Sequence, residues 1–113
     1  MEEPQARFAA DASLLNQVDA IVRRIVAEFC REATEVNSGD HFADLGLNSV
    51  RFVELAFVLE ELFRMGYVDM AEAPRAETVE DLSRFLAGKV AAGAAALPSA
   101  EETESAARRC ATA

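Results

Sequence analysis

The sequence contains no tryptophan, a single tyrosine, five glycines and three prolines in 113 residues. Without tryptophan, the core must consist of aliphatic side chains and phenylalanine, which suits packed helices better than a sheet sandwich. Alanine, leucine and glutamate recur, and these residues favour helices. The length leaves room for one domain with a modest core. We therefore predict an all-α fold.

Cysteine is also scarce, and its two positions suggest neither a disulfide framework nor a metal site. Cys30 falls within a helical apolar pattern, whereas Cys110 lies near the C-terminus, where we assign it no role. The N-terminus is acidic and lacks the apolar run of a signal peptide, and no apolar stretch is long enough to span a membrane. These absences predict a cytoplasmic protein with no metal and no membrane association.

Basic residues are few, 11 against 20 acidic residues, which gives a formal net charge of −9. Such a surface repels phosphate backbones, so we expect no binding to nucleic acid. It should attract basic patches on partner proteins and speed encounter with them. The plainer alternative is that the acidity only keeps a small protein in solution.

Apolar periodicity predicts a first helix from Ser13, as its N-cap, to about Ala33. A long loop, about 34–47, follows and contains a turn signal at 37–40. Apolar residues in this loop should pack on the bundle. The apolar stripe of the helix consists of Leu15, Val18, Val22, Ile25 and Phe29, and the apolar loop residues are Phe42, Leu45 and Leu47.

A second helix is predicted over about 49–65, with Asn48 as its N-cap and Gly66 at its end. A short irregular or one-turn helical piece covers 68–73, before Pro74. Thr78 then caps a last helix through about Val90. Its first turn contains Glu80 and Asp81, which suit the helix dipole, and its apolar face consists of Val79, Leu82, Phe85 and Leu86.

Three regions are expected along the chain. Residues 1–12 form a flexible N-terminus, and residues 13–90 form the folded domain. Residues 91–113 are dominated by alanine, glutamate, serine and threonine, which predicts a disordered tail or a linker. Because the chain begins with methionine and has one domain, we expect a discrete protein rather than a part of a larger synthase.

The segment Asp-Leu-Gly-Leu-Asn-Ser-Val, residues 44–50, places the hydroxyl of Ser49 at the first turn of a predicted helix. Unpaired N–H groups and the dipole make a helix N-terminus a favourable place for a phosphate, so this serine suits a phosphodiester link. It suits hydrolysis poorly, because the single histidine, His41, is eight residues upstream and the Gly-x-Ser-x-Gly elbow is absent. The plain alternative is that Ser49 only caps the helix.

The predicted second helix has apolar residues on two faces. The core face consists of Phe52, Leu55, Ala56, Leu59, Leu62 and Phe63. The opposite face consists of Val50, Glu54, Phe57, Val58 and Glu61. Apolar residues interleaved with carboxylates on a solvent face indicate a docking surface for basic, partly apolar partners. Alternatively, the helix is central in its bundle and buries more than one face.

These residues together resemble the acyl and peptidyl carrier proteins of fatty-acid, polyketide and nonribosomal-peptide synthesis. The resemblance covers about residues 13–89. It rests on residues 44–50, on Val53-Glu54-Leu55, on Leu59-Glu60-Glu61-Leu62-Phe63, and on Thr78-Val79 followed by Leu82 and Phe85-Leu86.

The resemblance implies a four-helix bundle with a short third helix and a long loop between the first two helices. It also implies that a phosphopantetheinyl transferase attaches 4'-phosphopantetheine from coenzyme A to Ser49. The thiol of that group would carry acyl or aminoacyl intermediates as thioesters. Val50, Glu54, Phe57 and Glu61 match positions that such carriers use to meet partner enzymes.

The sequence departs from the usual pattern of each branch of that family at one position. Acyl carriers usually have Asp immediately before the serine, where this chain has Asn48. Peptidyl carriers tolerate Asn there but typically have Gly-Gly where this chain has Gly46-Leu47. The sequence therefore leaves the cargo, acyl or aminoacyl, open, and Asn48 could narrow the choice of transferase.

The leading hypothesis is a non-catalytic, monomeric carrier. Its partners would be the transferase, a loading enzyme, and downstream synthase or tailoring enzymes. One rival is a carrier-like binding or scaffold protein whose serine stays unmodified. A second rival is a small hydrolase that uses Ser49 with a base from the preceding loop, for which the candidates are Asp40, His41 and Asp44.

Overall fold

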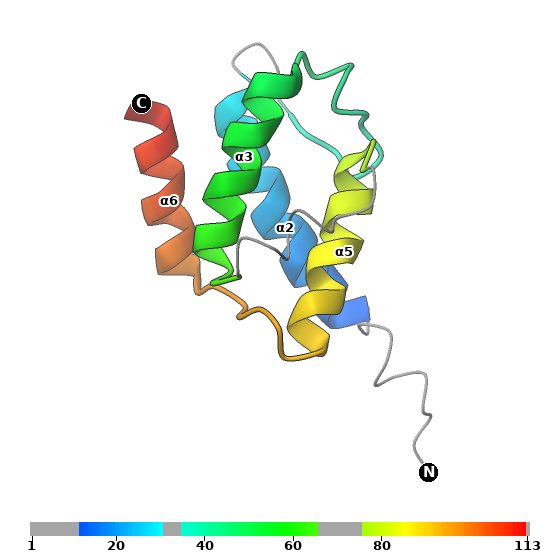
Figure 1. Ribbon diagram of the computed structural model, residues 1–113, viewed down its shortest axis with the longest axis vertical. Helices are drawn as coiled ribbons and strands as arrows, with labels where there is room; N and C mark the ends of the chain where they lie inside the picture. The colour runs from blue at the N-terminus through cyan, green and yellow to red at the C-terminus, as the bar shows by residue number, and fades with distance from the viewer. Residues whose placement is uncertain (1–11, 31–34, 66–75, 113) are drawn as a thin grey trace.

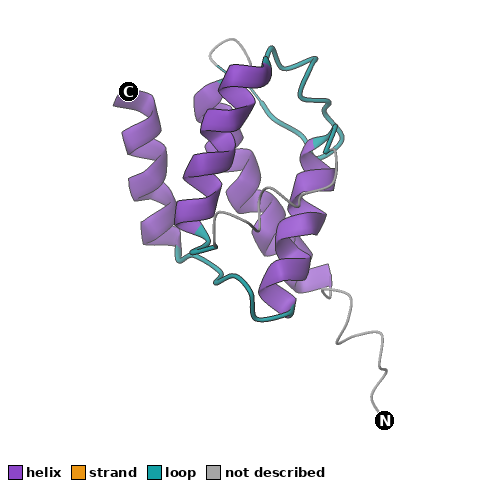
Figure 2. Ribbon diagram, viewed as in Figure 1, coloured by secondary structure: helices purple, strands orange, loops and turns teal. Residues whose placement is uncertain are grey.

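The computed structural model describes residues 12–30, 35–65 and 76–112. These residues form four helices, which lie side by side as a bundle (Figure 1). Within them no strand is present, and the only pairing of β type is an isolated bridge between His41 and Thr78 (Figure 2). The prediction of an all-α fold is confirmed. The helices are α2 (Ala12–Phe29), α3 (Ser49–Leu62), α5 (Val79–Ala91) and α6 (Ala100–Thr112).

Helix α2 is the central element, because α3, α5 and α6 all pack against it. Its stripe of apolar residues, spaced alternately by three and four, faces the core. Leu15 at its start is partly buried. The core residues of the stripe are Val18, Val22, Ile25 and Phe29.

Both predicted ends of this helix were wrong. Ser13 lies inside α2 rather than at its N-cap, and its hydroxyl accepts a hydrogen bond from the side-chain amide of Gln17 at 3.3 Å. The helix ends at Phe29 rather than near Ala33. The N–H of Cys30 bonds to the carbonyl of Ala27 at 3.3 Å, which tightens the last turn and closes the helix.

Helix α3 ends at Leu62, three residues before the predicted end. Arg64 adopts a left-handed conformation with φ of 56°. Its N–H bonds to the carbonyl of Glu61 at 3.2 Å, and the N–H of Met65 bonds to that of Glu60 at 2.9 Å. This is the Schellman pattern, which satisfies carbonyls left unpaired at a helix end. Arg64 therefore supplies the stop that we expected from Gly66.

The predicted disordered tail was wrong in its helical part, because residues 100–112 form α6. A capping box starts this helix: Glu102 N–H donates to Ser99 Oγ at 3.0 Å, and Ser99 N–H donates to Glu102 Oε1 at 2.9 Å. Small side chains of α6 pack against the rest of the bundle. The buried ones are Thr103, Ala106 and Ala107.

Ion pairs join α6 to α2 and to the end of α3, at the edge of the bundle (Figure 1). Arg24 of α2 donates two hydrogen bonds to Glu104, each 3.0 Å long. At the end of α3, Arg64 contacts Glu102 at 2.7 Å. Residues far apart in the sequence therefore close the bundle on this side.

The predicted short piece over 68–73, Pro74 and the expected flexible residues 1–11 lie outside the described residues. Among the helices that the structure describes, none combines the length and the apolar character required of a membrane span.

A buried carboxylate connects three parts of the chain. Asp19 of α2 is only 9% exposed. Its Oδ2 accepts hydrogen bonds from Ser38 Oγ at 2.6 Å and from Arg23 Nε at 2.8 Å. Its Oδ1 accepts one from Ser83 Oγ of α5 at 2.9 Å. The loop, α2 and α5 are thereby held in one arrangement.

Replacing Asp19 with alanine should destabilise the fold by about 2 kcal/mol, because the buried hydroxyl of Ser83 loses its acceptor. Urea unfolding followed by far-UV circular dichroism measures this loss. The control is Asp44→Ala, which removes an exposed loop carboxylate and should cost less than about 0.5 kcal/mol. Equal effects of the two substitutions would contradict the role given to Asp19.

Candidate functional site

Ser49 is the first residue of α3, and its side chain is exposed. The residue before it, Asn48, occupies the predicted N-cap position in an extended conformation, with φ of −83° and ψ of −177°. The Oδ1 atom of Asn48 accepts the N–H of Arg51 at 2.8 Å, and its carbonyl accepts the N–H of Phe52 at 2.9 Å. The cap leaves the hydroxyl of Ser49 at the positive end of the helix, open to another molecule.

The loop before the site packs on the core, as expected. Phe42 and Leu47 are buried, and the N–H of Leu47 bonds to the carbonyl of Phe42 at 3.2 Å. The ring of Phe42 meets that of Phe52 edge to face, with centroids 5.2 Å apart. Gly46 takes a φ of 82°, which a side chain would strain. These contacts fix the position of the loop and therefore that of Ser49, which follows it.

The same loop is fastened to the start of α5 by three backbone hydrogen bonds. Phe42 N–H donates to the carbonyl of Glu77 at 2.9 Å, Val79 N–H to that of Asp40 at 3.0 Å, and Glu80 N–H to that of Ser38 at 2.8 Å. Buried backbone groups of the loop are thereby satisfied without a sheet. A change that destabilises the start of α5 should therefore also destabilise the loop before Ser49.

The start of α5 carries the predicted cap. Thr78 Oγ1 accepts the N–H of Asp81 at 3.1 Å, and Asp81 Oδ2 accepts those of Glu77 and Thr78, both at 3.1 Å. The N–H groups of Glu77 and Thr78, in that order, lower the pKa of the Asp81 carboxyl below its ordinary value. Ionised Asp81 therefore stabilises the start of α5, to which the site loop is fastened.

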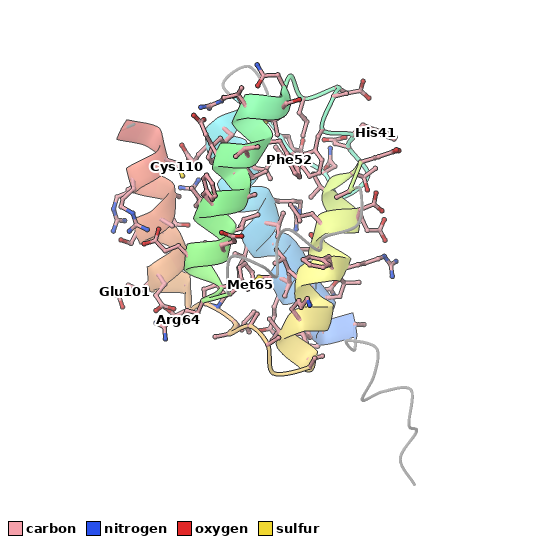
Figure 3. The ribbon with its side chains drawn as sticks, in the orientation of Figure 1. His41, Phe52, Arg64, Met65, Glu101 and Cys110 are labelled. Carbon is pink, nitrogen blue, oxygen red and sulfur yellow. The ribbon has the colours of Figure 1, made fainter. Side chains whose placement is uncertain are left out.

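The three candidate bases do not assemble with Ser49. His41 pairs its backbone with Thr78, and Figure 3 shows it beside the start of α5. The carboxylate of Asp40 accepts the N–H of Asn37 at 2.9 Å within its own turn. Within the described segments, no hydrogen bond joins Ser49 to any of the three. The described contacts therefore do not show the pairing of Ser49 with a base that hydrolysis by Ser49 would require.

Apolar side chains on the outer side of α3 are open to solvent. Val50 is 66% exposed, Phe57 54% and Val53 49%. Glu54 and Glu61 are exposed beside them. We call these five residues the exposed α3 face. Val53 was not predicted on this face, although its spacing from Val50 and Phe57 is helical.

The other predicted residues of α3 divide between core and edge. Val58 is only partly exposed, so α3 does bury some of its second side. Phe52 and Ala56 are partly buried at the edge of the core. The buried core residues are Leu55, Leu59, Leu62 and Phe63.

Arg51 ties α3 to α2 beside this face. Its Nη1 contacts Glu54 Oε1 at 2.8 Å, and its Nη2 donates to the carbonyl of Phe29 at 3.2 Å. The guanidinium carbon also lies 4.8 Å from the ring centroid of Phe29. Glu54 therefore has a fixed cation next to it, which reduces the negative charge that it presents.

Neither thiol has the setting of a reactive group. Burial raises the pKa of Cys30. Burial, assisted by the charge of Glu28, raises that of Cys110. Within the part of the chain that the structure describes, no cluster of histidine, cysteine and acidic residues is placed to hold a metal ion.

A family model of the phosphopantetheine attachment site matches residues 20–86. The chain belongs to this family of carrier domains. Such a domain is the site at which 4'-phosphopantetheine is attached, which supports a carrier role for this chain. The resemblance seen in the sequence is confirmed. Comparison with curated proteins and with solved structures gives no significant match.

The matched range ends within α5, so α6 lies outside it. The residues present fit the group that the family carries. An exposed serine hydroxyl, at the first residue of a capped helix, can accept a phosphodiester, and the N-terminal N–H groups of the helix favour its charge.

Acid should loosen the start of α5 through Asp81. Because the pKa of folded Asp81 is lowered, its stabilising contribution is complete above the ordinary value of about 4 and is lost as pH falls through the lowered value. We expect Asp81→Asn to lower the melting temperature at neutral pH and to flatten the acid dependence below about pH 4. Thermal melting at several pH values measures both effects. Asp44→Asn is the control, and an unchanged acid dependence in Asp81→Asn would contradict the assignment.

Proposed function

We propose that Ser49 carries the phosphopantetheine group and that the chain is a non-catalytic carrier for biosynthesis of the fatty-acid, polyketide or nonribosomal-peptide type. The supporting observation is the difference in surroundings among the three serines within the matched range, Ser38, Ser49 and Ser83. Ser38 and Ser83 both donate to the buried carboxylate of Asp19. Ser49 is exposed at a helix N-terminus, and its hydroxyl is accessible to a transferase.

The attached group would supply a terminal thiol that holds acyl or aminoacyl cargo as a thioester. The protein's own part is to fix the point of attachment and to keep the surrounding surface accessible. Asn48 anchors the helix end, and the loop fastened to α5 fixes its position. Nothing in this arrangement needs a catalytic side chain from the carrier itself.

Val50, Glu54, Phe57 and Glu61 would meet the partner enzymes, and Val53 joins them because it is exposed between Val50 and Phe57. Large apolar side chains exposed together mark an interaction surface. Its carboxylates and the net charge of −9 would steer basic partners toward it. Such docking is fast and reversible, which suits a carrier that visits a transferase, a loading enzyme and downstream enzymes in turn.

Incubation with coenzyme A and a broad-specificity phosphopantetheinyl transferase should add the mass of one phosphopantetheine group to the intact protein. Ser49→Ala should show no gain, because the attachment oxygen is gone. Ser13→Ala, which removes an exposed serine outside the matched range, should be modified like wild type. Modification of the Ser49→Ala variant would contradict the assignment.

If wild type gains no mass, Asn48→Asp decides between two explanations. Modification of this variant would show that Asn48 restricts the transferase, while the carrier function stands. Failure of both proteins would favour the rival hypothesis, a carrier-like binding or scaffold protein with an unmodified serine. Both proteins should be folded, since aspartate caps a helix as well as asparagine does.

Phe57→Ala should lower the kcat/KM of the transferase for this carrier by about tenfold, which corresponds to the loss of an exposed apolar anchor worth about 1.4 kcal/mol. Leu97→Ala is the matched control, because Leu97 is also a partly exposed large apolar residue but lies in the connection between α5 and α6. Equal kcat/KM values for the two variants would show that the transferase does not use Phe57.

A further inference from the structure

A groove of about 360 Å³ lies between α2, α3 and α6. Its apolar floor comes from all three helices: Phe29 of α2, Val58 of α3, and Ala106 and Cys110 of α6. Figure 3 shows Cys110 on α6, across α3 from His41. We call this feature the α6 groove. Because α6 lies outside the range matched by the family, one wall of the groove is an addition to the carrier domain.

The α6 groove continues the exposed α3 face. Glu54 and Glu61 belong to that face, and both also line the groove. Arg109 of α6 lines the far side of the groove. A partner resting on Val50 and Phe57 would therefore meet the two carboxylates first and α6 next. The two surfaces form one continuous area rather than two separate sites.

The groove does not face the attachment point. Val58 follows Ser49 by nine residues, which places it about 180° around the helix axis. Val53 and Phe57 are only about 40° and 80° from Ser49. A group attached to Ser49 would start on the opposite side of α3 from the groove floor. This placement favours an occupant that belongs to another molecule.

We propose that the α6 groove receives an amphipathic helix of a partner enzyme, with a large apolar side chain on the groove floor and an arginine or lysine beside Glu61. This proposal rests on the proposed carrier function, because it extends the docking surface of that carrier. It assigns α6 a part in partner recognition that the matched domain does not provide.

Charge favours a basic occupant. Three carboxylates and two guanidiniums line the groove, those of Glu28, Glu54, Glu61, Arg51 and Arg109. Glu28 is paired with Arg24 and Glu54 with Arg51, which leaves the exposed Glu61 as the lining carboxylate available to a basic occupant. Arg51 is held by Glu54 and by the ring and carbonyl of Phe29, so it stays at the wall of the groove. Glu61 is exposed where the groove meets the exposed α3 face. An occupant with an apolar side chain for the groove floor and a cation beside it for Glu61 would match this surface.

The probe for the test is a short synthetic helical peptide with leucine on one face and arginine on the other, labelled with a fluorophore. Binding is measured by fluorescence anisotropy on the full chain in a Ser49→Ala background, which keeps the protein free of the attached group. Glu61→Gln should weaken binding about three- to tenfold, because a charge-assisted contact is lost. Glu101→Gln, the same change in charge on α6 but outside the groove, should bind as the Ser49→Ala parent does.

Filling the groove gives a second pair of variants. Cys110→Trp should weaken peptide binding at least about tenfold, because a tryptophan would occupy the floor. Ala100→Trp places the same side chain at the exposed start of α6 and should have no such effect. Circular dichroism verifies that both variants fold. Alkylation of Cys110 by iodoacetamide is measured at alkaline pH, where the thiol ionises despite its raised pKa. Slower alkylation in the presence of the peptide tests the proposal on the native side chain, without a change in the groove.

Equal binding by Glu61→Gln and Glu101→Gln, together with unprotected Cys110, would overturn the proposal. Dimerisation of the protein through Cys110 and Val58, seen by sedimentation and abolished by Cys110→Trp, would overturn it as well, because a second copy would then be the occupant. The two proposals fail separately. Loss of the groove proposal leaves modification of Ser49 intact, and an unmodified Ser49 leaves peptide binding in the groove intact.

Discussion

The carboxylate of Asp19 holds together the parts of the chain from which the site is built. Burying a charge in the core costs free energy unless hydrogen-bond donors surround it. Ser38 from the loop and Ser83 from α5 provide them, so each segment can take only the position that keeps its hydroxyl near α2. The loop then continues along the start of α5 through backbone hydrogen bonds and ends at Asn48. The position of Ser49 therefore depends on the Asp19 contact at the start of the loop as well as on the packing of Phe42 and Leu47 and the cap at Asn48.

This construction separates a fixed interior from a surface left open. The bundle buries the aliphatic side of α3 but leaves Val50, Val53 and Phe57 in contact with water. Such exposure contributes nothing to the stability of the isolated fold, and contiguous exposed apolar side chains mark an interaction surface. In the proposed carrier, this arrangement would place an interaction surface beside Ser49, and the interior would keep the position of Ser49 the same for every partner.

The sequence predicted best those features that depend on neighbouring residues. The caps at Asn48 and Thr78 were predictable because each bonds to a backbone N–H three residues away. The stripe of α2 was predictable because its period matches the helix. The Asp19 contacts were not, since Ser38 and Ser83 lie far from it along the chain. Helix α6 was missed because alanine and threonine give its buried side little hydrophobic signal, although Ser99 and Glu102 had the spacing of a capping box. Without α6, the groove could not be predicted either.

Helix α6 is attached to the bundle by small buried side chains and exposed ion pairs, unlike the other helices. Its buried side chains are small and remove little apolar area from water, and Leu-rich or Val-rich contacts like those of α2 and α5 are absent from its described residues. The ion pairs at Glu102 and Glu104 are exposed, and such pairs contribute only about 0–1 kcal/mol each. Helix α6 is therefore held less firmly than α2, α3 and α5. The proposed recognition area would thus combine a wall fixed by the core, α3, with a wall that can shift at small energetic cost. Partners of different size could then use the same α3 residues if α6 adjusts to each of them.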